Sequence, residues 1–308
     1  MGLLNQASDG LPSVLFALVR TVRQRGAMDR EDLLALCCPP TLQAHTSGFE
    51  RDRLGPKTLL RWTQLGLFHQ ENATISLDEG VRDLPSEGLE EVRALAPVLR
   101  RLALLQTNNR QLNVDEGELA ADLTLALCWV LAQDIFALPG GAYKHIEPLE
   151  TLQFGTSQPY AFRNDTRWNG FRAWAPLLGF ASTEAVAGNP VLVVDPTPAV
   201  RGALPSAFGK MSELPIDDLL GRLASAVPVL DGGEYRVSVE ARLAQPNWRA
   251  TRPHEVSVSL SAALKRLDTS GVIRLESRAD APKRTLLGRG HRDLEQVSHV
   301  VRGNLDHA

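Results

Sequence analysis

The chain has 308 residues, of which 44% are hydrophobic and 22% are charged, values that are typical of a folded globular protein. Its net charge of −3 argues against a protein that coats nucleic acid by bulk attraction. No apolar run approaches the ~20 residues that cross a bilayer, and Met1–Asp9 lacks the basic start and hydrophobic core of a secretory signal. The three cysteines, two of them adjacent, are too few for a disulfide framework. These features predict a cytoplasmic protein that does not associate with membranes.

The first segment, residues 1–86, is expected to contain three helices followed by a hairpin. Pro12 can begin a helix because its missing N–H is not needed in the first turn. Asp29 can cap a second helix, and a third helix is expected over Lys57–Leu65. Ala73–Leu77 alternates apolar and polar residues, as a half-buried strand does. Three helices followed by a small hairpin predict a winged helix, which is a variant of the helix-turn-helix.

The second segment, residues 120–209, follows a leucine-rich helical connector, residues 87–119, and repeats the plan less clearly. A third helix is expected over Arg167–Leu178, with tryptophan and phenylalanine side chains about one turn apart. Val191–Val194 is expected to be a strand after it. The segment is therefore predicted to resemble a winged helix.

The third segment, residues 210–308, is expected to be a winged helix with a basic wing. A helix is expected over Asp217–Val227, a strand over Tyr235–Val239 and a third helix over Ser259–Thr269. The two paired strands of a wing are expected over Ile273–Arg278 and Arg284–Leu287, and a final helix over Leu294–Val301. The predicted fold class is mainly α with small β wings, of the α+β type, built from tandem winged-helix units.

The repeat rests on the ends of the three predicted third helices. Each has a large apolar residue four or five positions before a glycine: Gly66, Gly179 and Gly271. Packing followed by a C-terminal glycine is a common helix ending, but each of these endings also precedes a candidate strand. The combination favours tandem units of one kind.

The candidate nucleic-acid contacts of the third segment lie on its third helix, its wing and the following loop. Residues 249–308 hold 11 Lys and Arg against 7 Asp and Glu, so a phosphate backbone would be attracted here. The candidates are Lys265, Arg266, Arg274, Arg278, Lys283, Arg284, Arg289 and Arg292. The alternative interpretation is a solvated basic face, since charges on exposed strands also discourage edge pairing.

The first segment contributes two weaker candidates, Lys57 and Arg61 on its third helix. Its predicted wing is acidic, with Asp78, Glu79 and Asp83, which phosphates would repel. A protein contact or a structural role is therefore favoured for this segment.

No arrangement typical of catalysis is visible. The histidines and cysteines lack metal-ligand spacing, and neither a phosphate-binding lysine loop nor a nucleophile elbow occurs. Asp195 and Glu240 at the ends of two predicted strands are a conceivable Mg²⁺ pair, but Asp before Pro is an ordinary turn starter. The sequence predicts a non-catalytic protein without cofactor or metal.

Three stretches resemble a known family: Leu3–Leu15, Trp168–Trp174 with Leu178–Phe180, and Asp195–Arg201. Here the sequence is similar to the DpdG family, components of bacterial Dpd gene clusters, which insert 7-deazaguanine derivatives into DNA and defend against phage. The resemblance implies an accessory subunit beside a transglycosylase-like modifying enzyme and helicase- or nuclease-type partners. It carries over no catalytic residues.

The leading hypothesis is a DNA-binding and assembly subunit of a phage-defence cluster, with DNA and other proteins of the same system as partners. One alternative is a protein scaffold whose winged helices make no DNA contact. Another is a transcriptional regulator of the cluster, which is disfavoured because the segments are unequal and no effector domain is evident.

Overall fold

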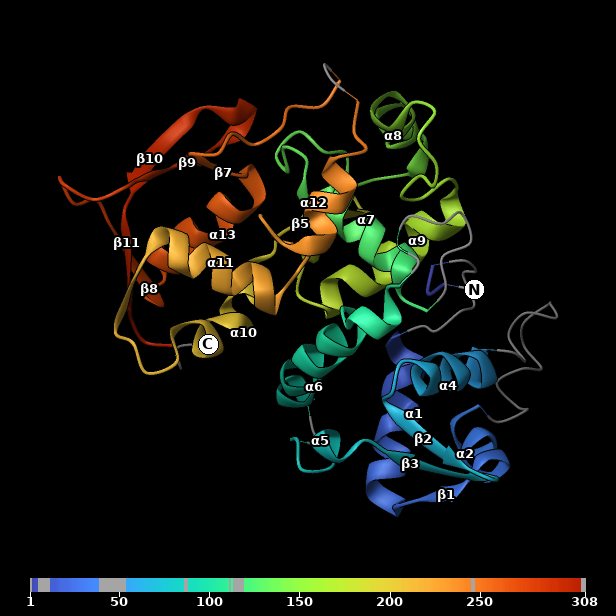
Figure 1. Ribbon diagram of the computed structural model, residues 1–308. Helices are drawn as coiled ribbons and strands as arrows, with labels where there is room; N and C mark the ends of the chain where they lie inside the picture. The colour runs from blue at the N-terminus through green and yellow to red at the C-terminus, as the bar shows by residue number, and fades with distance from the viewer. Residues whose placement is uncertain are drawn as a thin grey trace. The chain divides into compact units, whose positions relative to one another are not determined.

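The computed structural model describes residues 2–4, 12–38, 54–85, 88–110, 112, 119–244 and 247–305, and it is a mixed structure of helices and small sheets (Figure 1). This confirms the predicted α+β class. The chain divides into two compact units, the first made of Met1–Leu123 with Asn164–Leu178, the second of Thr124–Arg163 with Gly179–Ala308. The finer four-part division stays a prediction. No helix in the described ranges is long and apolar enough to cross a membrane.

The first unit begins with a helical layer and a three-stranded sheet. Its described elements are α1 (Pro12–Arg25), β1 (Met28–Asp29), α2 (Arg30–Cys37), α4 (Leu54–Gln64), β2 (Phe68–Glu71), β3 (Thr74–Leu77), α5 (Glu79–Arg82), α6 (Gly88–Ala103), η2 (Gln106–Asn108) and α9 (Asp165–Leu177). The strands pair antiparallel in the order β1-β3-β2. The three helices and the hairpin expected over residues 1–86 are therefore confirmed.

Local sequence signals explain why these elements end where they do. The Asp29 side chain accepts hydrogen bonds from the N–H groups of Glu31 and Asp32, as an N-cap residue does. Gly66 follows α4 at φ 92°, a conformation that residues with a side chain rarely adopt. There the N–H of Leu67 donates to the carbonyl of Trp62, which closes the helix end.

Two tryptophans and a buried carboxylate organise the core of the first unit. The rings of Trp62 and Trp174 lie 5.3 Å apart, centroid to centroid, and both side chains are fully buried. Asp122 accepts hydrogen bonds from the N–H groups of Leu3 (2.9 Å) and Leu4 (2.6 Å) and fixes the described N-terminal residues. Burial raises the pKa of Asp122 to about 6.

The second unit has three small sheets, with strand orders β6-β11-β8, β10-β9-β7 and β4-β5. Its described elements are α7 (Ala121–Leu131) from Thr124 onward, η3 (Tyr143–His145), α8 (Glu147–Phe154), β4 (Ala181–Val186), β5 (Asn189–Val194), α10 (Thr197–Phe208), β6 (Glu213–Pro215), α11 (Ile216–Ala226), α12 (Glu234–Glu240), β7 (Glu255–Val256), α13 (Val258–Thr269), β8 (Ile273–Glu276), β9 (Arg284–Leu287), η4 (Arg289–His291), β10 (Asp293–Val297) and β11 (His299–Arg302).

Part of the second unit repeats the order of elements found in the first. In the first unit a helix, an edge strand, two helices and two further strands follow one another, and the last strand lies at the centre of its sheet. The second unit has corresponding elements in the same order, α10, β6, α11, α13, β8 and β11, but α12 and β7 are inserted between its second and third helices, and β9 and β10 between its last two strands. The backbone contacts match as well. The N–H of Ile216 donates to Ser298 O, as that of Arg30 donates to Ala73 O. Gly271, at φ 72°, closes α13 as Gly66 closes α4.

The predicted wing of the third segment is not a simple hairpin. β8 pairs with β11, whereas β9 pairs with β10 and, in parallel, with β7. The expected pairing of Ile273–Arg278 with Arg284–Leu287 is therefore wrong. The two strands join different sheets because residues 277–298, which contain β9 and β10, are inserted between β8 and its true partner.

Two further predictions in this segment are corrected. Tyr235–Val239, expected as a strand, lies in α12, where the Arg236 guanidinium pairs with the Glu240 carboxylate one turn later. Leu294–Val301, expected as a helix, forms β10 and β11, because Val297 and Val300 are buried and β11 is the central strand between β6 and β8.

Candidate nucleic-acid interface

α13, the helix predicted as the third helix of residues 210–308, is mostly covered by its own unit. Eight of its twelve residues are buried. The Ser259 hydroxyl donates to the carbonyl of Leu131 in α7, and the Ser261 hydroxyl donates to that of Val256 in β7. The N–H of Leu287 in β9 donates in turn to Ser261 Oγ. Only the last turns of α13 reach solvent, so most of this helix has no surface to place in a DNA groove.

The two candidate cations on α13 are held by carboxylates. Lys265 Nζ lies 2.9 Å from Asp268 and 2.8 Å from Glu295, and the hydrogen bond with Glu295 raises the pKa of Lys265 above its usual range. Arg266 Nη1 lies 2.7 Å from Asp195 Oδ1. Both charges are therefore compensated within the protein.

Asp195, considered above as half of a metal pair, has a structural role at the start of α10. Besides Arg266, its Oδ1 atom accepts from the N–H and the hydroxyl of Thr197. Within the described ranges, no group of three His, Cys, Asp or Glu side chains is arranged to hold a metal ion.

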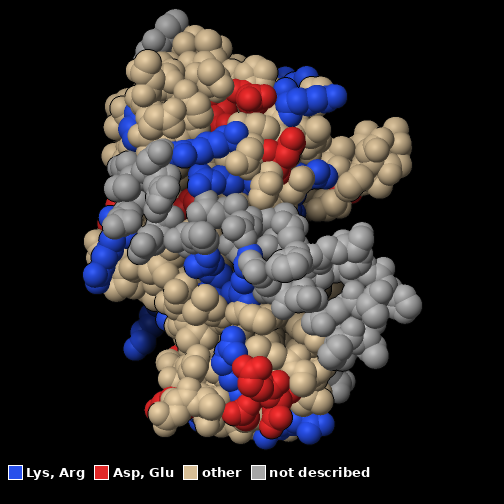
Figure 2. All heavy atoms as spheres, turned by 90° about the vertical axis from the view of Figure 1, so that its right-hand side faces the viewer, with Lys and Arg blue, Asp and Glu red and all other residues tan. Residues whose placement is uncertain are grey.

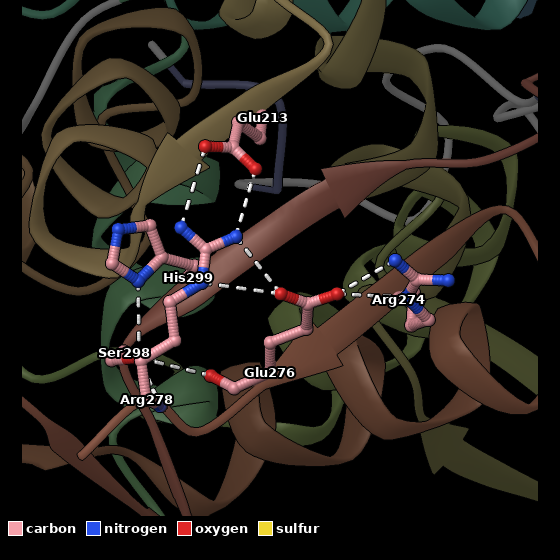
Figure 3. Close-up of polar contacts among 6 residues, drawn as sticks. All are labelled: Glu213, Arg274, Glu276, Arg278, Ser298 and His299. Atoms are coloured by element: carbon pink, nitrogen blue, oxygen red, sulfur yellow. Dashed lines mark hydrogen bonds and ion pairs between the residues drawn. The ribbon is translucent and has the colours of Figure 1, made fainter.

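Arg274 and Arg278 belong to an ionic network, here called the wing network, that crosses the β6-β11-β8 sheet from β8 to Glu213 on β6 (Figure 3). Arg278 Nη2 lies 2.8 Å from Glu213 and 2.9 Å from Glu276, and Arg274 Nη2 lies 2.6 Å from Glu276. Hydrogen bonds from Arg278 lower the pKa of both carboxyl groups, and the carboxylates raise the pKa of Arg278. Two positive and two negative charges cancel.

The carboxylates of this network reach solvent beside the cations. The side chain of Arg278 is 41% exposed and that of Glu213 is 48% exposed, while Arg274, at 69%, is more exposed than Glu276, at 26%. A phosphate group approaching the network therefore meets both signs. Ser298 completes the arrangement, since its hydroxyl oxygen accepts the N–H of Arg278 and lies 3.0 Å from His299 Nδ1 (Figure 3). The network therefore joins strands rather than presenting a free basic surface.

The remaining candidates of the second unit divide into one paired and three unpaired cations. Arg284 Nε lies 2.5 Å from Asp217 Oδ1. Lys283, Arg289 and Arg292 make no ion pair or side-chain hydrogen bond with any residue that the structure describes. Five of the eight predicted cations in this unit are thus neutralised by carboxylates.

In the first unit, Lys57 and Arg61 lie half-buried on α4. The Arg61 guanidinium donates to the Gln64 side chain (3.1 Å), and between them Leu60 is 52% exposed. An exposed leucine at the centre of this helix face is an apolar surface feature rather than a phosphate contact. On the face shown in Figure 2, Asp and Glu side chains likewise lie close to Lys and Arg, and the basic side chains form separate groups.

The cations were predictable from the sequence, but most of the carboxylates that pair with them were not. The pair Arg274 and Glu276 could have been anticipated, because residues two apart in a strand project from the same face. Glu213 and Asp217 lie more than sixty residues before the arginines that they bind, and no local signal connects them.

Comparisons with known proteins agree with the resemblance. Neither the search of curated proteins nor the search of solved structures gave a match. A sequence model of the family described as DpdG-like matches residues 1–281 of the 308. The chain therefore belongs to the DpdG-like family, whose members are components of Dpd defence clusters.

Proposed function

We propose that this chain is a non-catalytic assembly subunit of a Dpd defence cluster, built from two winged-helix units that bind other proteins of the system. The observation that carries the proposal is the burial of α13. In a DNA-reading winged helix the third helix lies in the major groove, whereas here β7, β9 and α7 cover it.

The arrangement of elements supports two winged helices. In the first unit the order α1, β1, α2, α4, β2, β3 places β3 between β1 and β2. In the second unit the order α10, β6, α11, α13, β8, β11 places β11 between β6 and β8. Three helices closed by a small sheet of this kind are typical of the fold. The second copy differs by two insertions: α12 and β7 lie between α11 and α13, and β9 and β10 lie between β8 and β11.

The surface chemistry also favours proteins as partners. The wing network carries two positive and two negative charges that pair with one another (Figure 3), which gives little long-range attraction for a phosphate backbone. In the first unit, α4 exposes Leu60 and α2 exposes Leu36. Exposed leucines on the helices that would face DNA suit an apolar protein contact better.

The proposal is tested by affinity capture of the tagged full chain from cells that carry the whole cluster, after nuclease digestion. We expect one or more cluster proteins to be recovered. Leu60→Glu should reduce recovery, and Leu89→Glu, which changes another exposed leucine of the same unit, should not. Recovery of no cluster protein by the unmodified chain would contradict the assembly role.

A further inference from the structure

Two loops of the second unit, residues 249–254 and 288–292, lie together beside the β10-β9-β7 sheet. The first loop leads into β7 and the second connects β9 to β10. β7 pairs in parallel with β9, with Glu255 opposite Thr285 and Val256 opposite Leu286, and the three strands lie side by side in Figure 1. Both loops are attached to the segment that follows α7. The indole N–H of Trp248, just before the first loop, donates to Ala132 O at 3.0 Å, and the N–H of Gly290 in the second loop donates to Asp134 Oδ2 at 2.7 Å.

The 288–292 loop is tightly held. The N–H of Gly288 donates to the carbonyl of Arg292 (2.8 Å), and the N–H of His291 donates to that of Gly288 (2.9 Å). Gly290 has φ 69°, and its N–H donates to Asp134 Oδ2 at 2.7 Å. This anchored loop presents Arg289 and Arg292 to solvent.

The 249–254 loop adds two arginines above a buried carboxylate. Arg249 Nη2 lies 2.7 Å and Arg252 Nη1 3.9 Å from Glu255. The Glu255 side chain is only 3% exposed, whereas that of Arg252 is 66% exposed. Burial acts against the charged form of Glu255, but the N–H of Arg252 and the guanidinium of Arg249 keep its pKa below the usual range.

His291 shows that the loops share one electrostatic environment. Burial and the nearby charge of Arg249 lower the pKa of His291, while Asp134 and Glu255 act in the opposite direction. The carboxylates thus lie at the base of the two loops, where they hold backbone N–H groups and Arg249. The arginines project outward.

This arrangement differs from the wing network in the exposure of the carboxylate: Glu255 is only 3% exposed, whereas Glu276 is 26% and Glu213 48% exposed. We infer that the loops 249–254 and 288–292 bind the phosphate backbone of a nucleic acid, with Arg252, Arg289 and Arg292 as the contacting side chains. Binding here needs no access to α13 and reads no bases, so it depends on salt and not on sequence. It is independent of the assembly role proposed above.

The test is fluorescence anisotropy of the full chain with a labelled duplex of about 20 base pairs over a series of salt concentrations. Arg289→Gln with Arg292→Gln removes two loop charges. The matched control, Arg274→Gln with Arg278→Gln, removes two positive charges from the wing network. Circular dichroism and thermal unfolding establish that both variants are folded.

We expect the loop variant to bind about ten-fold more weakly and to reduce the slope of log K against log salt by about 1.8, since each lost phosphate contact contributes about 0.9. The wing control should stay within about two-fold of the unmodified chain. Equal weakening in both variants, loss in the control alone, or no salt-dependent binding by the unmodified chain would overturn the inference.

Discussion

The buried carboxylate of Asp122 makes the stability of the first unit depend on pH. Burial raises the pKa of this group from 3.8 to about 6 in the folded chain. A carboxyl group with a raised pKa binds more protons in the folded state than in the unfolded state, so folding is favoured at low pH and stability falls as the pH rises through about 6. The full difference of about two pKa units corresponds to about 3 kcal/mol, of which about 2 kcal/mol is expected between pH 4.5 and 7.5.

Asp122→Asn isolates this contribution. The amide stays neutral and has one acceptor oxygen, so it cannot accept from both Leu3 and Leu4, and this lost hydrogen bonding costs the same at every pH. Any pH dependence of the difference between the two proteins therefore comes from the titration of Asp122. The assay is urea unfolding followed by tryptophan fluorescence at several pH values. Subtracting the variant from the unmodified chain cancels the other titrating groups.

The difference in free energy of unfolding, unmodified chain minus Asp122→Asn, should decrease by about 2 kcal/mol from pH 4.5 to 7.5. A difference that is flat to within about 0.5 kcal/mol, or that increases with pH, would refute the reasoning.

Three other changes test the packing. Glu240→Gln leaves the buried Arg236 guanidinium without its nearest carboxylate and should lower the free energy of unfolding by about 3 kcal/mol, whereas Arg236→Met should cost less; the reverse order would contradict the pairing. Trp62→Ala removes a fully buried ring against Trp174 and should cost about 3–5 kcal/mol in the same assay, so a cost under about 1 kcal/mol would argue against this core. Gly66→Ala places a side chain at φ 92° and should lower the free energy of unfolding by about 1 kcal/mol or more, which lowers the midpoint of thermal unfolding by several degrees. An unchanged midpoint would contradict the assigned turn.

The parts of the fold that were predictable from the sequence are those set by neighbouring residues. The Asp29 cap, the Gly66 turn and the alternation ending at Leu77 are local signals, and they define the elements of residues 1–86. The same applies to α11 and α13.

The parts that were missed depend on distant pairing. β8 looks like half of a hairpin with β9, but its partner β11 comes after an insertion that no periodic pattern reveals. Tyr235–Val239 alternates like a strand, yet a segment this short fits either class, and the bond between Arg236 and Glu240 accompanies a helix.

The candidate site was only partly predictable for a related reason. A count of cations finds the basic residues, but their effective charge depends on where carboxylates fold. Glu213 neutralises Arg278, whereas buried Glu255 leaves Arg252 exposed. Arg289 and Arg292 were identified from the sequence. The supporting roles of Asp134 and Glu255 require the tertiary structure.

The central claim, that the chain assembles with other proteins of the cluster without needing nucleic acid, is tested most directly by measuring the mass of the complexes that it forms. Purified full chain, of 33.6 kDa alone, is mixed with purified proteins of the cluster after nuclease treatment and passed through size-exclusion chromatography with light scattering. The account predicts a peak whose mass is that of this chain together with at least one cluster protein. Elution of every component at its own separate mass would contradict it.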